Sequence, residues 1–166
     1  MLKKDNFSPA DWNTLRDTPY LVGFSTVLAG SSGLATIKEL IALSQGIIEN
    51  QASSMALIRD LTTRGEMEAA QAALKQSFGD GKPSSDSVRR RTLEQVRSSL
   101  DLLEKSGSEE ETDSYRRMLY GIAEKVANAA REGGFLGFGG TPVSEAERSF
   151  LNELRSALQL EPAKVV

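Results

Sequence analysis

The residue types that most enzymes use for acid–base or nucleophilic chemistry near neutral pH are missing from this chain. Its 166 residues include no histidine and no cysteine. Histidine is the usual general base and, with cysteine, the usual ligand of transition metals. The sequence therefore excludes Ser-His-Asp and Cys-His hydrolysis, zinc-thiolate sites, HExxH metalloproteases and ExxH di-iron bundles. We predict a protein that is not an enzyme, with no catalytic residues, no metal ligands and no cofactor.

The most unusual segment is the glycine-rich stretch REGGFLGFGGTPVSEAE, residues 131–147. Its glycines follow an expected helix rather than a strand, and no Gly-Lys-Ser/Thr sequence ends it. It therefore matches neither the dinucleotide-binding fingerprint nor the P-loop. Between Gly133 and Pro142 there is no Asp, Asn or Glu, which excludes an EF-hand calcium loop.

The apolar residues of this stretch are Phe135, Leu136 and Phe138. A glycine C-cap is often followed by an apolar residue that folds back on the last helical turn, so we expect these three to plug the end of a helical bundle. The alternative is an exposed contact loop, which would mean a protein partner or, with the nearby Arg131, a membrane surface.

A second candidate site is a basic patch on one helix. Arg90 and Arg97 are seven residues apart, so they lie on the same helical face, and Arg116 and Arg117 on the next helix could extend the patch. The alternative is an ordinary solvated helix surface, which the net charge of −3 favours. No aromatic residues are interleaved with these arginines, so we expect no nucleic-acid partner.

Two further clusters have structural and functional interpretations. The acidic run Glu109, Glu110, Glu111 and Asp113 could hold a hard cation, but it is also the typical first turn of a helix stabilised by its dipole. The aromatic residues near the start of the chain either anchor the first helices to the core or form the edge of a dimer interface; they are Phe7, Trp12, Tyr20 and Phe24.

The elements that position these residues are expected to be helices throughout, since apolar residues recur at helical spacing and no alternating segment is flanked by hairpin turns. Ser8 and Pro9 predict a short first helix ending near Asp17, and Thr18-Pro19 predict the start of a second through about Leu28. Further helices are expected over residues 66–78, 88–104, 109–129 and 145–158. The prediction is an all-α, irregular bundle of six to eight helices, with one domain over residues 1–158 and a loose tail over 159–166.

The segment from Leu34 carries apolar residues on so much of its circumference that we expect it to be the packed centre of the fold. It could continue past Asn50 or restart there with Asn50 as the cap, and Gly65 is a plausible stop. Capping boxes are expected at two helix starts, Ser108 with Glu111 and Ser144 with Glu147.

Two segments carry a resemblance. DWNTLRDTPYLVG near the start and AREGGFLGFGGTPVSEAERSFLNELRSAL near the end resemble a family of small bacterial all-helical proteins with no assigned activity. VSEAERSFLNELRSAL alone is similar to the helix-opening segment of tellurite-resistance TerB-like domains, and this resemblance implies a helical fold and, as in some members, an association with metal through acidic residues. Glycines and phenylalanines stand here where those acidic residues are expected, so no metal ligand is carried over.

These observations lead to one functional expectation and two alternatives. We expect a cytoplasmic, non-enzymatic interaction or assembly module that binds a protein partner or a second copy of itself, with no secretory signal and no membrane-spanning segment. The first alternative is a ligand- or metal-associated stress protein of TerB-like type. The second is peripheral membrane association through Phe135, Leu136 and Phe138.

Overall fold

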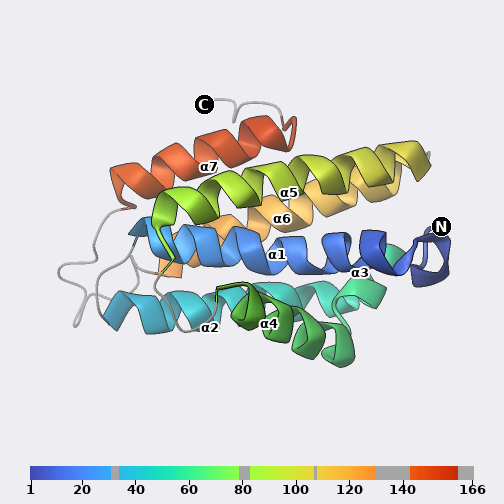
Figure 1. The fold of residues 1–166 in the computed structure, drawn as a ribbon, viewed down its shortest axis with the longest axis horizontal. Helices are drawn as coiled ribbons and strands as arrows, with labels where there is room; N and C mark the ends of the chain where they lie inside the picture. The colour runs from blue at the N-terminus through green and yellow to red at the C-terminus, as the bar shows by residue number, and fades with distance from the viewer. Residues whose placement is uncertain (31–33, 79–82, 107, 130–142, 161–166) are drawn as a thin grey trace.

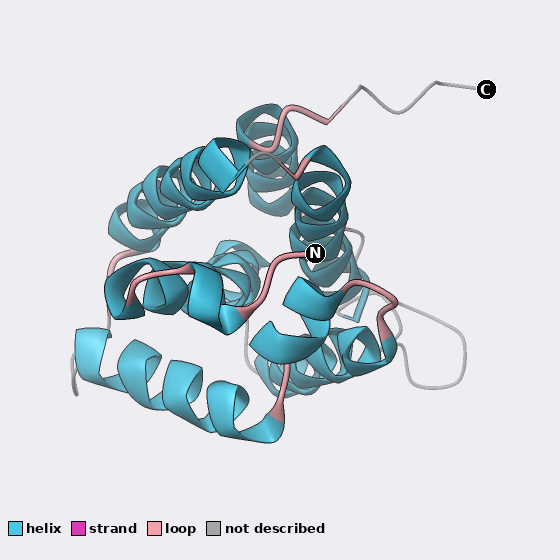
Figure 2. Cartoon of the chain, turned by 90° about the vertical axis from the view of Figure 1, so that its right-hand side faces the viewer, coloured by secondary structure: helices cyan, strands magenta, loops and turns pink. Residues whose placement is uncertain are grey.

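The described part of the chain is entirely helical. The computed structural model describes residues 1–30, 34–78, 83–106, 108–129 and 143–160. Helices and short loops account for these ranges, with no strand among them (Figure 2). The all-α bundle expected from the sequence is confirmed. Its elements are η1 (Lys4–Asn6), α1 (Pro9–Gly30), α2 (Leu34–Glu49), η2 (Asn50–Ala52), α3 (Ala56–Leu61), α4 (Arg64–Phe78), α5 (Ser85–Ser106), α6 (Glu109–Ala129) and α7 (Glu145–Ala157).

Helix α1 is the centre of the bundle. It lies between α5, α6 and α7 on one side and α2 and α4 on the other, and it packs against all five (Figure 1). Its buried side chains point in all directions around the helix, and they include Trp12, Leu15, Tyr20, Val22 and Val27. From Thr18 to Val27 nearly every residue of α1 is buried, so α1 rather than α2 is the buried helix.

The prediction of two short helices before residue 30 is wrong. Pro19 lies inside a single helix that runs from Pro9 to Gly30. Proline cannot donate the backbone bond to the carbonyl four residues earlier, which here belongs to Leu15. The Tyr115 hydroxyl donates to that carbonyl instead, at 2.8 Å, so the helix continues through the proline.

The prediction that α2 is the packed centre is also wrong. One side of α2 is buried against α1 and α6 through residues that include Leu43 and Ile47. The opposite side exposes Leu40, Ile41 and Ile48. The broad apolar face read from the sequence is therefore only partly a core face.

The helix boundaries in the middle of the chain differ in detail from those expected. Helix α2 ends at Glu49 and is followed by the short η2, so the chain does not continue as one helix past Asn50. Gly65 does not stop a helix but is the second residue of α4. No side chain lies near it that an added Cβ would meet, so glycine there reflects no packing constraint.

The helix caps expected from the sequence are present at the starts of α1 and α7. Ser8 accepts from the backbone N–H of Asp11 at 3.2 Å at the start of α1. Ser144 and Glu147 form the predicted capping box of α7, with Ser144 Oγ accepting from Glu147 N and Glu147 Oε2 accepting from Ser144 N. Among the described helices, none is both long and apolar enough to cross a membrane.

Candidate functional site

An apolar surface on α2 is the most conspicuous unpaired feature of the described residues. Apart from Met1, the large apolar side chains that remain exposed in this part of the chain all lie on α2: Leu40, Ile41 and Ile48 are 43%, 53% and 49% exposed. Ile41 and Ile48 are two helical turns apart on one side of the helix, with Ser44 and Gln45 between them. We call Leu40, Ile41, Ser44, Gln45 and Ile48 the α2 outer face.

The outer face lies directly opposite the core side of α2. Ala42, Leu43 and Ile47 are buried. By helical periodicity, these three residues lie on the side of α2 that is turned away from Ile41 and Ile48. Hydrophobic residues scattered singly on a surface need no explanation, but here Leu40, Ile41 and Ile48 are all exposed on one helix.

Charged residues lie along one flank of the α2 outer face. Lys38 and Glu49 are both exposed, one before and one after the two isoleucines. Glu49 forms an ion pair with Lys125 of α6. The patch therefore has an apolar centre and a charged edge, and Glu49 on that edge is already paired with Lys125.

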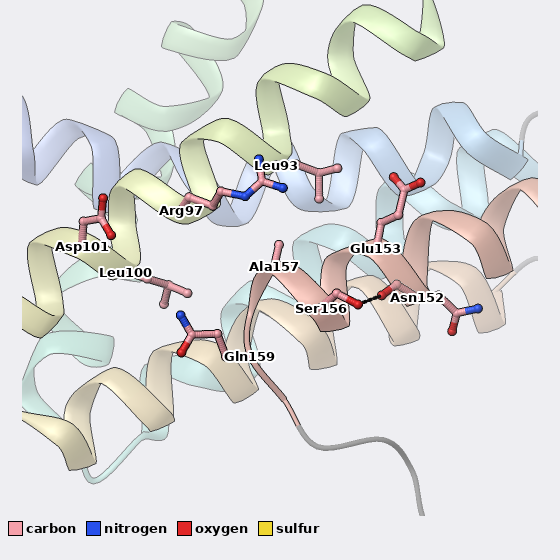
Figure 3. A pocket seen from close by; sticks show the side chains of 9 residues that line it. All are labelled: Leu93, Arg97, Leu100, Asp101, Asn152, Glu153, Ser156, Ala157 and Gln159. Atoms are coloured by element: carbon pink, nitrogen blue, oxygen red, sulfur yellow. Dashed lines mark hydrogen bonds between the residues drawn. The ribbon is translucent and has the colours of Figure 1, made fainter.

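A groove between α5 and α7 is a second candidate. It has a volume of about 810 Å³, and Figure 3 shows side chains of the two helices on its two sides. Leu93, Leu100 and Ala157 supply its apolar lining, while Arg97, Asp101, Asn152, Glu153, Ser156 and Gln159 supply its polar lining.

The charges of this groove are largely balanced. Arg89 holds Glu153 in a bidentate pair, with Nε 2.7 Å from Oε2, and this hydrogen bond keeps the pKa of Glu153 below its usual range. Arg97 shares the lining with the carboxylates of Asp101 and Glu153. A groove with one arginine and two acidic residues offers no concentrated charge to an anion or a cation.

Arg90 and Arg97 of the predicted basic patch are both exposed on α5, and Arg117 is exposed on α6. The proposed extension of the patch by Arg116 does not hold, because Arg116 pairs with Glu104 and Asp113 at 2.7 Å each. Whether the remaining arginines form one surface stays a prediction.

Glu111, the buried residue of the predicted acidic run, has a structural role. Glu111 is 3% exposed and accepts hydrogen bonds from the Leu2 backbone N–H, at 2.7 and 2.9 Å, and from the Ser108 hydroxyl at 2.9 Å. It therefore ties the first residues of the chain to the start of α6. Glu109 and Glu110 are exposed in the first helical turn, as the dipole interpretation expects.

Sequence reasoning missed a pair of buried carboxylates, Glu39 of α2 and Glu147 of α7. They are 0% and 2% exposed, and both oxygens of Glu39 and Oε1 of Glu147 have no hydrogen-bond partner. Burial, and then the charge of Glu147, raise the pKa of Glu39 to about 7. One feature of the sequence could have revealed its burial. Glu39, Leu43 and Ile47 follow one another at intervals of four, which places Glu39 on the core side of α2.

The remaining predicted residues divide between the core and the segments outside the described residues. Trp12 and Tyr20 are buried at 2% and 4% exposure, which favours the core interpretation over a dimer edge. Phe135, Leu136 and Phe138 lie outside the described residues, so their placement stays a prediction. No group of three or more acidic, histidine or cysteine side chains that could hold a metal ion occurs in the described ranges.

Comparison of the chain with models of protein families, with curated proteins and with solved structures gives no match. A functional proposal therefore rests on the chemistry of the surfaces and side chains described above.

Proposed function

We propose that this protein is a non-enzymatic assembly module that self-associates through the α2 outer face. The observation that carries the proposal is the exposure of Ile41 and Ile48 on the solvent side of α2. Burying a half-exposed isoleucine is worth about 1 kcal/mol, and a pairing of two copies would bury four. The lack of histidine and cysteine supports the non-enzymatic part of the proposal.

The spacing of the two isoleucines favours a second copy of this chain as the partner. In a symmetric dimer each copy contributes the same patch, so residue i of one copy meets residue j of the other and the reverse. If two α2 helices lie antiparallel about the midpoint between Ser44 and Gln45, Ile41 of each copy meets Ile48 of the other. The patch is therefore complementary to itself.

The charged flank agrees with the same arrangement. Lys38 lies six and a half residues before the midpoint and Glu49 four and a half after it. At about 1.5 Å per residue, the two-fold axis places Lys38 of one copy within about 3 Å, measured along the helix, of Glu49 of the other. Both lie on the same side of the seam, so Lys38 of one copy would approach the Glu49–Lys125 pair of the other at each end of the interface.

The first experiment measures the oligomeric state by sedimentation velocity over a range of protein concentrations. We expect a dimer in the wild type and a monomer in the variant Ile41→Ser plus Ile48→Ser, since both substitutions remove apolar area from the seam without touching the core. Substituting the exposed α4 residues Gln71 and Lys75 by serine gives a control that should remain dimeric.

A cross-linking experiment tests the register. Because the chain has no cysteine, Ser44→Cys introduces a single thiol near the proposed two-fold axis. We expect a short bismaleimide to link two copies through this position but not through Ser98→Cys, which is exposed on α5. A wild type that stays monomeric at all concentrations, or a serine double variant that dimerises as well as the wild type, would contradict the proposal.

A further inference from the structure

A cavity between α6 and the end of α7 is lined by three arginines. It has a volume of about 440 Å³. The α6 side is lined by Asp113, Arg116, Arg117 and Tyr120, and the other side by Arg155 of α7 with Gln159 and Leu160 of the turn that follows. The α6 residues lie three, four and seven positions after Asp113, so they share one face of that helix. Three guanidinium groups and a single carboxylate therefore line the same space.

Arg116 is fixed in place by its partners. Its Nη1 lies 2.7 Å from Asp113 Oδ1 and its Nη2 lies 2.7 Å from Glu104 Oε1. Its Nε is buried and has no acceptor among the described residues. A buried charged donor without an acceptor is one mark of a place that a water molecule or an ion completes. Because two carboxylates balance the charge of Arg116, unbalanced positive charge in this cavity has to come from the other two arginines.

Arg155 and Arg117 are the arginines with donors to spare. Arg155 Nη2 donates to the Tyr120 hydroxyl, and its guanidinium lies over the Tyr120 ring, 4.6 Å from the centroid. These contacts orient Arg155, whereas the carboxylate of Glu124 is as far as 4.0 Å from its Nη2. Arg117 is exposed and forms no ion pair among the described residues. One oriented and one unpaired guanidinium group therefore line the cavity from its two sides.

The same cavity contains a strained backbone position. Within the described ranges, Gln159 is the one residue other than glycine with a positive φ, at 55°. The turn is held by hydrogen bonds of 3.1 Å from Leu160 N to Arg155 O and from Gln159 N to Ser156 O. The Gln159 side chain also accepts from Arg116 Nη2 at 3.4 Å. Strained positions of this kind cluster at ligand sites, so the turn supports a binding role independently of the charges.

We propose that this cavity binds a phosphate group, either as the free ion or as the monoester of a small molecule. Guanidinium groups present paired N–H donors that match the oxygens of a phosphate. Arg117 contacts the phosphate from α6 and Arg155 from α7. Tyr120 and Leu160 offer apolar surface to an organic substituent. The cavity has room for one, because small-molecule sites have volumes of roughly 300–1,000 Å³.

Titration of the isotope-labelled protein with inorganic phosphate at pH 8 tests the proposal, with the backbone amide signals followed by NMR. We expect shifts that saturate and that are largest at Arg117, Tyr120, Gln159 and Leu160. Sodium chloride at the same ionic strength is the reference, because screening acts on all exposed charges. A second titration with phenyl phosphate distinguishes the source of the phosphate group. Tighter binding than inorganic phosphate assigns a monoester, and equal or weaker binding assigns the free ion.

Arg117→Gln and Arg155→Gln should each weaken phosphate binding by roughly tenfold or more, because each removes charged donors to the anion. Arg90→Gln is the matched control, since Arg90 is exposed on α5 and lies outside the lining. It should bind as the wild type does. Shifts that do not saturate, or an unchanged affinity in both cavity variants, would overturn the proposal. If Arg155→Gln fails to fold, Arg117→Gln decides, because Arg117 has no ion pair to lose.

This test is independent of self-association. The cavity lies between α6 and the end of α7, whereas α2 and its outer face lie on the other side of α1 (Figure 1). Phosphate should therefore bind the variant Ile41→Ser plus Ile48→Ser as tightly as the wild type. The failure of one proposal is in this way distinguishable from the failure of the other.

Discussion

The hydroxyl of Tyr115 in α6 donates to the backbone carbonyl of Leu15 in α1, at 2.8 Å, and so occupies the acceptor that Pro19 leaves without its helical partner. Both Tyr115 and Leu15 are fully buried. A side chain one hundred residues away in the chain thus completes the hydrogen bonding of the central helix. This bond couples the continuity of α1 to its packing against α6.

Tyr115→Phe should lower the free energy of unfolding by about 1–3 kcal/mol, because it leaves the buried carbonyl of Leu15 without a donor while keeping the aromatic ring. In a Pro19→Ala background the backbone N–H of residue 19 can bond to that carbonyl, so the same substitution should cost less. Chemical denaturation of the four proteins of this double-mutant cycle measures the coupling. Equal losses in both backgrounds would contradict the assignment.

Gly23→Ala should destabilise the protein by about 1–3 kcal/mol through overpacking. An added Cβ at Gly23 would lie 2.1 Å from Cδ1 and 2.9 Å from Cγ of Leu43, which is buried between α1 and α2. The matched control is Gly121→Ala in α6, where no atom lies within 4 Å of the added Cβ. It should stabilise the protein by about 0.5–1 kcal/mol through helix propensity. Thermal or denaturant unfolding of both variants checks the opposite signs.

Gln159→Gly should raise the free energy of unfolding by about 1 kcal/mol. Gln159 has a backbone φ of 55°, in the left-handed region that residues other than glycine disfavour. It follows α7 in a Schellman motif, in which Leu160 N donates to Arg155 O and Gln159 N to Ser156 O. Gln159→Ala keeps the strain and serves as the control in the same unfolding measurement. A Gln159→Gly variant no more stable than Gln159→Ala would contradict this account of the turn.

The sequence predicted the fold class and most helices because amphipathic spacing and caps are local signals. The Ser144–Glu147 capping box is an example, and it is confirmed. The continuous α1 could not be predicted in this way, because the partner that makes Pro19 tolerable is Tyr115, which is distant in sequence. The tail was expected to be loose from residue 159, whereas the turn at Gln159 and Leu160 is hydrogen-bonded.

The candidate sites were less predictable than the helices. Counting apolar residues on α2 correctly found a broad apolar surface, but only tertiary packing decides which part of it is buried. That packing leaves Ile41 and Ile48 outside. Glu39 was overlooked because one acidic residue on a core face has little weight in a periodicity argument. Its importance depends on Glu147, which comes more than one hundred positions later.

The stability of the protein should fall as the pH rises from about 4.5 to 7, to the extent that Glu39 contributes. Burial, and then the Glu147 charge, raise the folded-state pKa of Glu39 from 4.5 to about 7, so the folded protein binds more protons than the unfolded chain in this window. At about 1.4 kcal/mol per unit of pKa difference, the contribution lost above pH 7 is up to about 3.5 kcal/mol.

Other carboxylates contribute in the opposite direction, since the hydrogen bond from Arg89 lowers the pKa of Glu153. The informative quantity is therefore the difference in unfolding free energy between the wild type and Glu39→Gln, measured by urea denaturation at a series of pH values. We expect the stability of the variant relative to the wild type to rise from pH 5 to about pH 7 and to level off above that. A difference that does not change with pH would show that Glu39 titrates alike in the folded and unfolded chain, and the argument for an unpaired buried charge would fail with it.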